Sequence, residues 1–245
     1  MANVHKGKKT LNRQSRQYLF SAFVCAGLIG AYVVMIFRLG EELSINPFFH
    51  LLPVIWLMGI FYYCRRYRIL QAGARGENEI LTYVRNLPNQ YHVFSNFVIQ
   101  EKRIRDEADF IVVGENGVFV VEGKNHLGKI VGTEDDIEWK QYKFGQKGKL
   151  YTKNMMNPIK QTKWHRHNIE GMLRNAGFCI SVVPLLVFTN TAVQLEIISS
   201  EIVVLKGSKY VNDYILRYSP QRKLDKHMIK DIVALLEKKA RVIQS

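Results

Sequence analysis

Two acids and a lysine near the middle of the chain, Asp109, Glu122 and Lys124, have types and spacing suited to metal-assisted hydrolysis. Carboxylates that face each other across two strands repel, so they are expected to hold a cation between them. A hard divalent ion bound by one or two carboxylates and a substrate phosphate is the usual magnesium arrangement. Such an ion can activate water and neutralise charge on a scissile phosphate. Lys124 would orient the water or stabilise the charged transition state. The same residues would also fit a structural ion-pair cluster.

A β-hairpin is expected to position these side chains. Two apolar runs, Ala108–Val113 and Val118–Val121, are separated by Gly-Glu-Asn-Gly, which is a strong hairpin signal. If the central Glu-Asn pair forms the turn, Asp109 lies directly opposite Glu122 and both point to one face. The lysine two residues further along shares that face because side chains alternate along a strand.

A helix before the hairpin is expected to add another acid. The segment Gly73–Leu87 carries apolar residues at helical spacing and ends before Pro88. Glu77 falls on the apolar side of this helix and Glu79 on the wetter side. A carboxylate aimed at a core is costly unless something pairs with it. The remaining pattern indicates an α/β sandwich, with strands at 91–99, 130–132, 137–142, 184–189 and 196–205 and helices at about 158–175 and 225–242.

Two apolar stretches, Tyr18–Phe37 and Ile45–Cys64, carry no charged residue. A helix of about 20 residues spans roughly 30 Å, the thickness of a bilayer's hydrocarbon core. Basic residues precede the first stretch and arginines follow the second, whereas the connecting loop carries two acids. The positive-inside rule therefore predicts a transmembrane hairpin with both chain ends in the cytoplasm. A buried helical hairpin of a soluble protein is the alternative.

The formal net charge of +14 is expected to attract polyanions, either nucleic acid or an anionic lipid surface. A solvated surface with a positive bias would have the same composition. Three arginines, Arg65, Arg66 and Arg68, are expected to hold lipid headgroups. Two further groups could contact nucleic acid by gripping phosphates or stacking on bases: the basic residues Lys140, Lys143, Lys147, Lys149, Lys153, Lys160, Lys163 and Arg166, and the interleaved aromatic residues Trp139, Tyr142, Phe144 and Tyr151. An ordinary exposed hairpin with lysines for solubility explains them equally well.

Two histidines on the predicted helix after residue 158, His165 and His167, suggest a zinc site at first sight. Residues two apart on a helix point in different directions, so these two are not expected to share one ion. The three cysteines form no CxxC motif and no disulfide framework, which fits a reducing cytoplasm.

The order of these motifs resembles a known nuclease superfamily. Asp109 followed by Glu122-Gly123-Lys124 resembles the Asp…Glu-x-Lys core of the PD-(D/E)xK restriction-endonuclease-like superfamily. More specifically, the chain resembles the nuclease-related domain (NERD) family over roughly residues 70–190. The resemblance rests on Gly73-x-x-Gly76-Glu77, on the apolar runs 108–113 and 117–121 with the following Glu122–Asn125, and on Gly128, Trp139 and Asn157-Pro158-x-x-Gln161.

This resemblance implies a restriction-endonuclease-like mixed sheet flanked by helices and a Mg²⁺ or Mn²⁺ cofactor. It implies the following roles: Asp109 and Glu122 as metal ligands, Lys124 as the catalytic lysine, Glu77 as an auxiliary acid, and Gln161 as the glutamine that follows the core in RecB-like nucleases. Two departures stand out. Gly123 replaces a residue that is often bulkier, and Glu107 would face Lys124 in the assumed hairpin register and could hold it in a salt bridge.

The sequence thus predicts a membrane-anchored, metal-dependent nuclease-type phosphodiesterase that acts on DNA, or alternatively on RNA. A catalytically silent domain that binds nucleic acid or a partner at the membrane is the second interpretation, and a scaffold whose hairpin oligomerises in the bilayer is the third. The expected segments are a basic cytoplasmic N-terminus (1–17), a transmembrane hairpin (18–64, with helices 18–37 and 45–64), a basic linker (65–72), a NERD nuclease-like domain (73–205) and a C-terminal helical extension packed on that domain (206–245).

Overall fold

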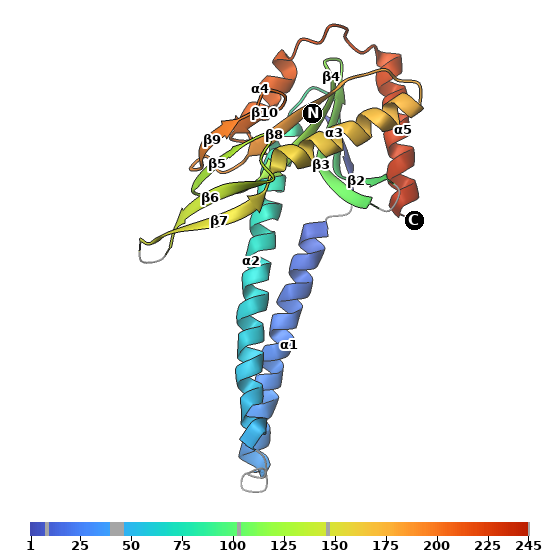
Figure 1. Ribbon diagram of the computed structural model, residues 1–245. Helices are drawn as coiled ribbons and strands as arrows, with labels where there is room; N and C mark the ends of the chain where they lie inside the picture. The colour runs from blue at the N-terminus through green and yellow to red at the C-terminus, as the bar shows by residue number, and fades with distance from the viewer. Residues whose placement is uncertain (8–9, 40–46, 102–103, 146–147, 245) are drawn as a thin grey trace. The chain divides into compact units, whose positions relative to one another are not determined.

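The computed structural model describes residues 1–7, 10–39, 47–101, 104–145 and 148–244. They form a mixed α/β chain with two sheets and two long apolar helices (Figure 1). The chain divides into two compact units, one containing Met1–Lys8 and Arg75–Ser245 and the other Lys9–Ala74.

A six-stranded mixed sheet is the centre of the first unit (Figure 1). The strand order is β1-β2-β3-β4-β8-β10. Strands β2, β3 and β4 are antiparallel to one another, while β1, β8 and β10 each run parallel to a neighbour. The strands are β1 (Asn3–Lys6), β2 (His92–Glu101), β3 (Ile104–Gly114), β4 (Gly117–Lys124), β8 (Val182–Phe188) and β10 (Val203–Lys206).

The β3–β4 hairpin has the register that the sequence predicts. Gly114 pairs with Gly117 and Val113 with Val118, so the two residues between the glycines form the turn. The pairing continues as far as Phe110 opposite Val121. Asp109 and Glu122 are therefore the first residues beyond the paired part of the hairpin.

Helices cover both faces of this sheet. Ile111 and Val120 pack on the side of α3 (Pro158–Asn175) and α5 (Lys226–Gln244). Val112 and Phe119 pack on the opposite side, with the last turns of α2 and with α4 (Tyr210–Arg217). Because both faces are buried, the hairpin strands are continuous apolar runs instead of alternating ones.

The strands predicted at 130–132 and 137–142 belong to a second sheet, which is present in addition to the mixed sheet that the resemblance implies. The order of the second sheet is β7-β6-β5-β9, with β5 (Lys129–Thr133), β6 (Glu138–Phe144), β7 (Leu150–Met156) and β9 (Gln194–Ile198). The chain leaves the main sheet after β4 and returns as the parallel strand β8. Parallel neighbours need a long crossover, and β5, β6, β7 and α3 supply it. Ile130 and Trp139 of the second sheet pack with Ile159 of α3.

The N-terminus contributes a strand that the sequence does not predict. Residues 1–17 are expected to be a basic tail, but Asn3–Lys6 forms β1, which extends the main sheet beside β2. Ala2 and Val4 pack against the buried cluster under β2. A strand of four residues with one lysine and one histidine has too weak a periodicity to be recognised without its partner strand.

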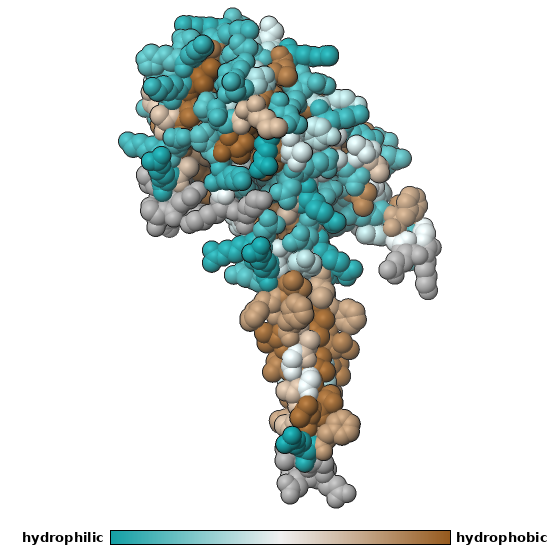
Figure 2. Space-filling view, turned by 180° about the vertical axis from the view of Figure 1, so that it is seen from behind, coloured by the Kyte–Doolittle hydropathy of each residue, from teal (hydrophilic) through white to brown (hydrophobic). Residues whose placement is uncertain are grey.

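Two helices make up most of the second unit: α1 (Thr10–Leu39) and the part of α2 (Leu52–Val84) up to Ala74, preceded by a short 3₁₀ helix, η2 (Pro47–Leu51). Both are long and apolar enough to cross a membrane. Large apolar side chains such as Phe20, Phe23 and Phe61 are about two-thirds exposed, and hydrophobic side chains surround these helices in Figure 2. Exposed apolar surface of this extent marks a membrane or protein contact.

The segment predicted as a basic linker, residues 65–72, is helical in the structure, and the helix predicted from Gly73 is the end of the continuous helix α2. No proline lies between Cys64 and Gly73, and the arginine, leucine, glutamine and alanine residues there favour helix. The second apolar stretch begins at residue 45, and its first two residues lie outside the described ranges, as do the two acids of the predicted loop.

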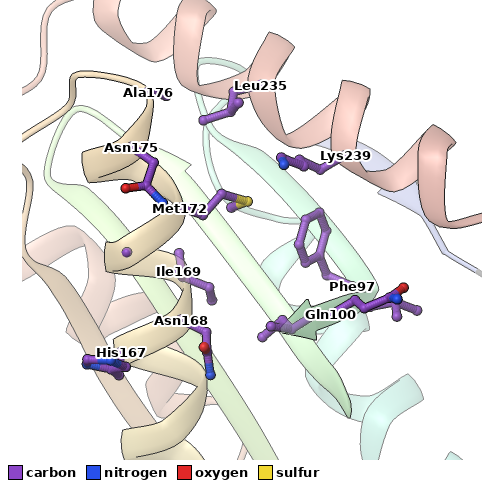
Figure 3. A pocket seen from close by; sticks show the side chains of 13 residues that line it. Phe97, Gln100, His167, Asn168, Ile169, Met172, Asn175, Ala176, Leu235 and Lys239 are labelled. Atoms are coloured by element: carbon purple, nitrogen blue, oxygen red, sulfur yellow. The ribbon is translucent and has the colours of Figure 1, made fainter. Parts of the chain in front are cut away.

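A hollow of about 390 Å³ lies between β2, α3 and α5 (Figure 3). Phe97, Met172 and Leu235 line it from these three elements. Asp109, Glu122 and Lys124 do not contribute to its lining, so the candidate site has to be sought at the end of the β3–β4 hairpin.

Candidate active site

Asp109 is held by the backbone of the opposite strand. Its Oδ2 accepts a hydrogen bond of 2.7 Å from the Gly123 amide. A Cβ atom on Gly123 would lie 2.6 Å from Ile80 Cδ1 and 3.4 Å from Asp109 Oδ2. Gly123 thus allows helix α2 to pack closely against β4, which explains why this chain has glycine between the glutamate and the lysine.

Glu122 and Lys124 form an ion pair that helix α3 completes. Lys124 Nζ lies 2.6 Å from Glu122 Oε1 and donates a hydrogen bond of 2.9 Å to Gln161 Oε1. Glu122 is almost completely buried. The expected salt bridge from Glu107 to Lys124 is thus replaced by contacts from β4 itself and from α3, because the pairing of β3 with β4 ends at Phe110.

A buried histidine lies behind Glu122. His165 of α3 is fully buried, and its Nε2 is 3.2 Å from Asp106 Oδ2. Its Nδ1 lies 3.3 Å from Glu122 Oε2, although neither atom makes a hydrogen bond with a described residue. His167 is exposed, so the two histidines point in different directions as predicted. The ring of His165 instead lies against the carboxylate of Glu122.

Glu77 approaches from helix α2, as its predicted inward orientation requires. Its Oε2 accepts a hydrogen bond of 3.3 Å from Asn96 Nδ2. Asn96 lies in the middle of β2 with φ 53°, and the pairing of β2 with β3 is interrupted at this residue. A left-handed asparagine inside a strand is uncommon and often marks a functional position. In the register of β2 with β3, Asn96 is the residue opposite Asp109.

The three acids and the lysine influence one another electrostatically. Burial and the negative charges of Glu122 and Glu77 raise the pKa of Asp109 well above its usual range. Burial opposes ionisation of Glu122, but Lys124 and His165 outweigh it and lower the pKa of that carboxyl. Burial would lower the pKa of Lys124, but Glu122 and Asp109 raise it, so the lysine stays charged.

This donor set fits a hard divalent cation. Glu122 Oε2 is buried without a hydrogen-bond partner among the described residues, and Asp109 is destabilised as an anion by its acidic neighbours. An added cation would relieve both conditions. Within the described part of the chain, no three His, Cys, Asp or Glu side chains form a ready-made metal cluster. An ion would therefore bind through Asp109 and Glu122, with water and substrate phosphate completing its shell, as is usual for Mg²⁺.

Comparisons with known proteins match the middle of the chain to a family model. The family model described as nuclease-related domain (NERD) matches residues 72–189. Residues 72–189 therefore carry a NERD domain. An uncharacterised protein of Bacillus anthracis is 34% identical over 112 residues, which are 45% of this chain and 50% of that protein. The chain thus spans about half the length of this relative. No solved structure matches significantly.

The Asn-Pro-x-x-Gln motif of the NERD domain has a clear physical role here. Asn157 caps α3, because its Oδ1 accepts a hydrogen bond from the Ile159 amide. Its Nδ2 donates to the carbonyl oxygens of Thr133, Glu134 and Asp136. The helix start is thereby fixed to the loop between β5 and β6. Gln161, one turn further on, is held where it reaches Lys124.

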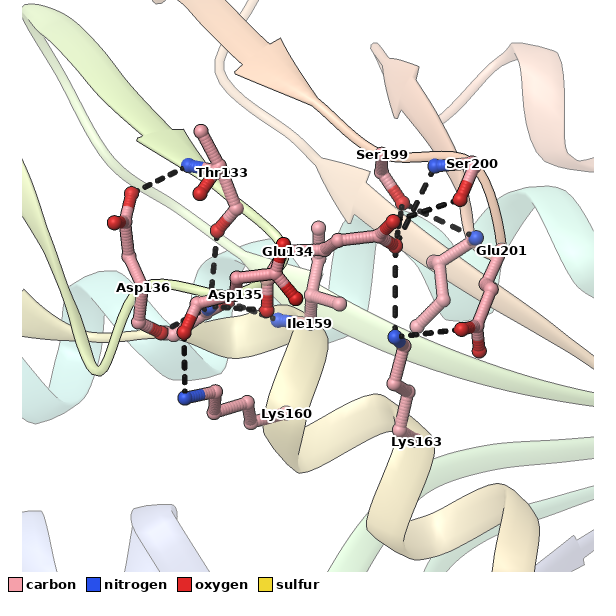
Figure 4. Close-up of polar contacts among 12 residues, drawn as sticks. Thr133, Glu134, Asp135, Asp136, Ile159, Lys160, Lys163, Ser199, Ser200 and Glu201 are labelled. Atoms are coloured by element: carbon pink, nitrogen blue, oxygen red, sulfur yellow. Dashed lines mark hydrogen bonds and ion pairs between the residues drawn. The ribbon is translucent and has the colours of Figure 1, made fainter.

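Three of the basic residues predicted to contact nucleic acid have other partners in the NERD domain. Lys163 pairs with Glu134 and Glu201, and Lys160 donates to the Asp135 carbonyl (Figure 4). Arg166 pairs with Glu170 one turn further along α3. These three side chains stabilise the start and the middle of α3. Their predicted contact with nucleic acid would require exchange of these partners.

Three residues of the NERD site are missed by sequence reasoning: Asn96, Asp106 and His165. Asn96 has an unusual backbone conformation that no local pattern indicates. His165 is recognisable only as part of a histidine pair, and its contact with Glu122 depends on how α3 packs on β4. Asp106 precedes the predicted core and resembles a charged turn residue.

Glu77 is expected to make the stability of the NERD domain depend on pH. Burial, together with Glu107 and Glu122, raises the pKa of Glu77 to about 7, against the Asn96 hydrogen bond and Lys124. The folded chain therefore binds this proton more tightly than the unfolded chain, and the unfolding free energy falls as pH rises from about 4.5 to about 7. In metal-free buffer, Glu77→Gln should reduce the difference in Tm between pH 5 and pH 8 by about a few degrees. The exposed neighbour provides the control, since Glu79→Gln should leave that difference as in the wild type. An unchanged difference in Glu77→Gln would contradict the expected shift.

Proposed function

We propose that the NERD domain is a metal-dependent phosphodiesterase that cleaves nucleic acid. The observation that supports this most is the convergence of Asp109, Glu122, Lys124 and Gln161 from β3, β4 and α3. A bound Mg²⁺ or Mn²⁺ would supply an activated water and neutralise charge on the scissile phosphate. Asp109 and Glu122 are the residues that would hold it.

The protein's own residues divide the remaining work. Lys124 keeps its proton beside Glu122 and presents a positive charge where negative charge develops on the phosphate. Gln161 and Glu122 fix the direction of the ammonium group. His165 lies between Asp106 and Glu122 and contacts the carboxylates of both, so it helps to position Glu122. Glu77, with its pKa near neutrality, is placed to accept or return a proton at the edge of the site.

The test uses the full-length chain in a neutral detergent, because a fragment beginning near residue 70 would lack β1. Plasmid, single-stranded DNA and RNA are incubated with the protein and Mg²⁺ or Mn²⁺. We expect cleavage that EDTA abolishes and that Asp109→Asn reduces about a hundredfold or more. Asp213→Asn, on α4 away from the site, is the matched control and should cleave like the wild type. Cleavage that survives both Asp109→Asn and Glu122→Gln would contradict the proposed site.

We also propose that α1 and α2 anchor the domain in a membrane with both ends of the chain in the cytoplasm. Their exposed apolar side chains and the arginines that follow the second span support this. Arg65, Arg66 and Arg68 would then lie near anionic headgroups. Carbonate extraction of membranes should leave the protein in the pellet, and protease added to sealed inside-out vesicles should digest the NERD domain.

One observation favours a second function, in which the domain binds nucleic acid or a protein partner without cleaving. Lys124 already neutralises Glu122 at 2.6 Å, so this carboxylate has a cation without any metal. In that case, binding would persist in Glu122→Gln and no divalent ion would produce cleavage.

A further inference from the structure

The basic and aromatic residues of the β6–β7 hairpin divide between the two faces of the second sheet. Trp139 and Gln141 of β6 are buried, and Lys143 continues the same alternation beyond the buried part. Across the strand pair, Tyr151 is opposite Lys143 and Lys153 is opposite Gln141. Lys143, Tyr151 and Lys153 therefore project from one face, whereas Lys140 and Phe144 project from the other.

The face with Lys143, Tyr151 and Lys153 lies next to the candidate active site. Gln141 Nε2 donates a hydrogen bond of 2.8 Å to the carbonyl of Leu127, three residues beyond Lys124. Gly128, the next residue, has φ 87°, and a Cβ atom there would lie 3.3 Å from Lys143 Cγ and 2.1 Å from the Tyr142 carbonyl oxygen. The residues that follow Lys124 at the end of β4 therefore lie against this face of β6.

Positive charge accumulates between the candidate active site and the face with Lys143, Tyr151 and Lys153. The charges of Lys124, Lys143 and Lys153, together with burial, lower the pKa of His126 to about 4. Burial and the positive charge of Lys153 lower the pKa of Lys143. Among the described contacts, neither lysine has an acidic partner in an ion pair. Uncompensated lysines beside a phosphodiesterase site favour an anionic ligand there.

An exposed tyrosine between two lysines narrows the class of that ligand. Tyr151 is 48% exposed and shares its face with both lysines. Aromatic side chains interleaved with basic ones are the usual platform for single-stranded nucleic acid, because bases stack on the ring while cations follow the backbone. In a duplex the bases are stacked on one another and the ring would have no base to bind.

We propose that Lys143, Tyr151 and Lys153 form a track for single-stranded nucleic acid that leads to Lys124. The lysines contact phosphates next to the scissile bond, and Tyr151 stacks on an unpaired base. This inference rests on the proposed function of the site, and it adds the substrate class and the path by which the strand enters.

The test measures binding separately from cleavage. Full-length protein in neutral detergent is titrated into labelled oligothymidine in EDTA, and the fluorescence anisotropy is recorded over a series of salt concentrations. Lys143→Ala and Lys153→Ala should each weaken binding and reduce the slope of log K against log salt by about 0.7. Tyr151→Ala should weaken binding about fivefold or more, and Tyr151→Phe should restore it. Lys140→Ala and Phe144→Ala, on the opposite face of the same hairpin, are the matched controls and should bind like the wild type.

Several results would overturn the track. One is an unchanged salt slope in both lysine variants, and another is a loss of binding affinity in Lys140→Ala equal to that in the lysine variants. A third is duplex binding that is as tight as single-strand binding and equally sensitive to Tyr151→Ala. Loss of binding to anionic vesicles in the lysine variants, with oligothymidine binding intact, would assign the face to lipid and also overturn it. Absence of cleavage in Mg²⁺ or Mn²⁺ with lysine-dependent binding retained would instead contradict only the proposed catalysis.

Discussion

Replacing Lys124 with methionine is expected to lower the rate of divalent-ion-dependent cleavage about a hundred- to a thousandfold. Among the described residues, the ammonium group is the cation bonded to Glu122 Oε1, and Gln161 fixes its direction. Methionine keeps the length of the side chain but cannot stabilise charge on a phosphate. Single-turnover cleavage of labelled DNA at saturating Mg²⁺ measures the loss. Binding in EDTA should fall far less, because the phosphates still meet other lysines.

Two variants separate a catalytic role for Lys124 from a structural one. Lys129 also forms an ion pair, with Glu196 across β5 and β9, but its side chain is 41% exposed. Lys129→Met should therefore cleave at nearly the wild-type rate. Removal of Lys124 also leaves Glu122 buried without its cation, which is destabilising. The double variant Glu122→Gln/Lys124→Met relieves that charge, so it should fold and remain inactive. Recovery of cleavage in the double variant would contradict a direct role for the lysine.

Replacing Asn157 with alanine should produce the largest loss of stability among the polar residues around the site. The side chain caps α3 and donates to three carbonyl groups of the β5–β6 loop. Loss of the cap costs about 1 kcal/mol, and the part-buried carbonyls of Glu134 and Asp136 lose their donor, which costs about 1–3 kcal/mol more. We expect the unfolding free energy to fall by about 2–4 kcal/mol, measured by urea unfolding. Cleavage should fall as well, because Gln161 follows one turn later.

A nearby asparagine offers a matched control for Asn157. Asn154 is exposed on β7, and its side chain donates to Glu138 on the neighbouring strand, so Asn154→Ala should change stability by less than about 0.5 kcal/mol. The variant Asn157→Asp keeps the capping oxygen but has no donor for the carbonyls. It should be about as unstable as Asn157→Ala. Wild-type stability in Asn157→Asp would mean that the cap alone matters.

Local sequence was sufficient for the hairpin and for the residues at its end. Continuous apolar runs around Gly-Glu-Asn-Gly determine the turn, and a two-residue turn leaves one register in which both strands are buried. The helical spacing that aims Glu77 inward is likewise a local property, and in the structure this acid lies within electrostatic reach of Glu122 and Lys124.

Other features depend on partners that are far away in the sequence. Three strands of the second sheet lie in the crossover between the parallel strands β4 and β8, and the fourth, β9, comes from beyond β8 and pairs with β5. β1 becomes a strand only because β2 offers it an edge. The bond between Lys124 and Gln161, which joins residues 37 apart, depends on the angle at which α3 crosses β4. Periodicity within one segment contains no information about any of these.

By itself, the sequence determined which residue types meet at the end of the β3–β4 hairpin and that two apolar helices precede the domain, because both follow from short-range patterns of side-chain size and polarity. Tertiary structure alone decided which partners those residues have. It placed His165 behind Glu122 and Asn96 beside Glu77, and it turned Lys143 and Lys153 toward the site while Lys140 faces away. The physical reason is that an ion pair or a charged face is set by distances across packed elements, which the order of residues along the chain does not specify.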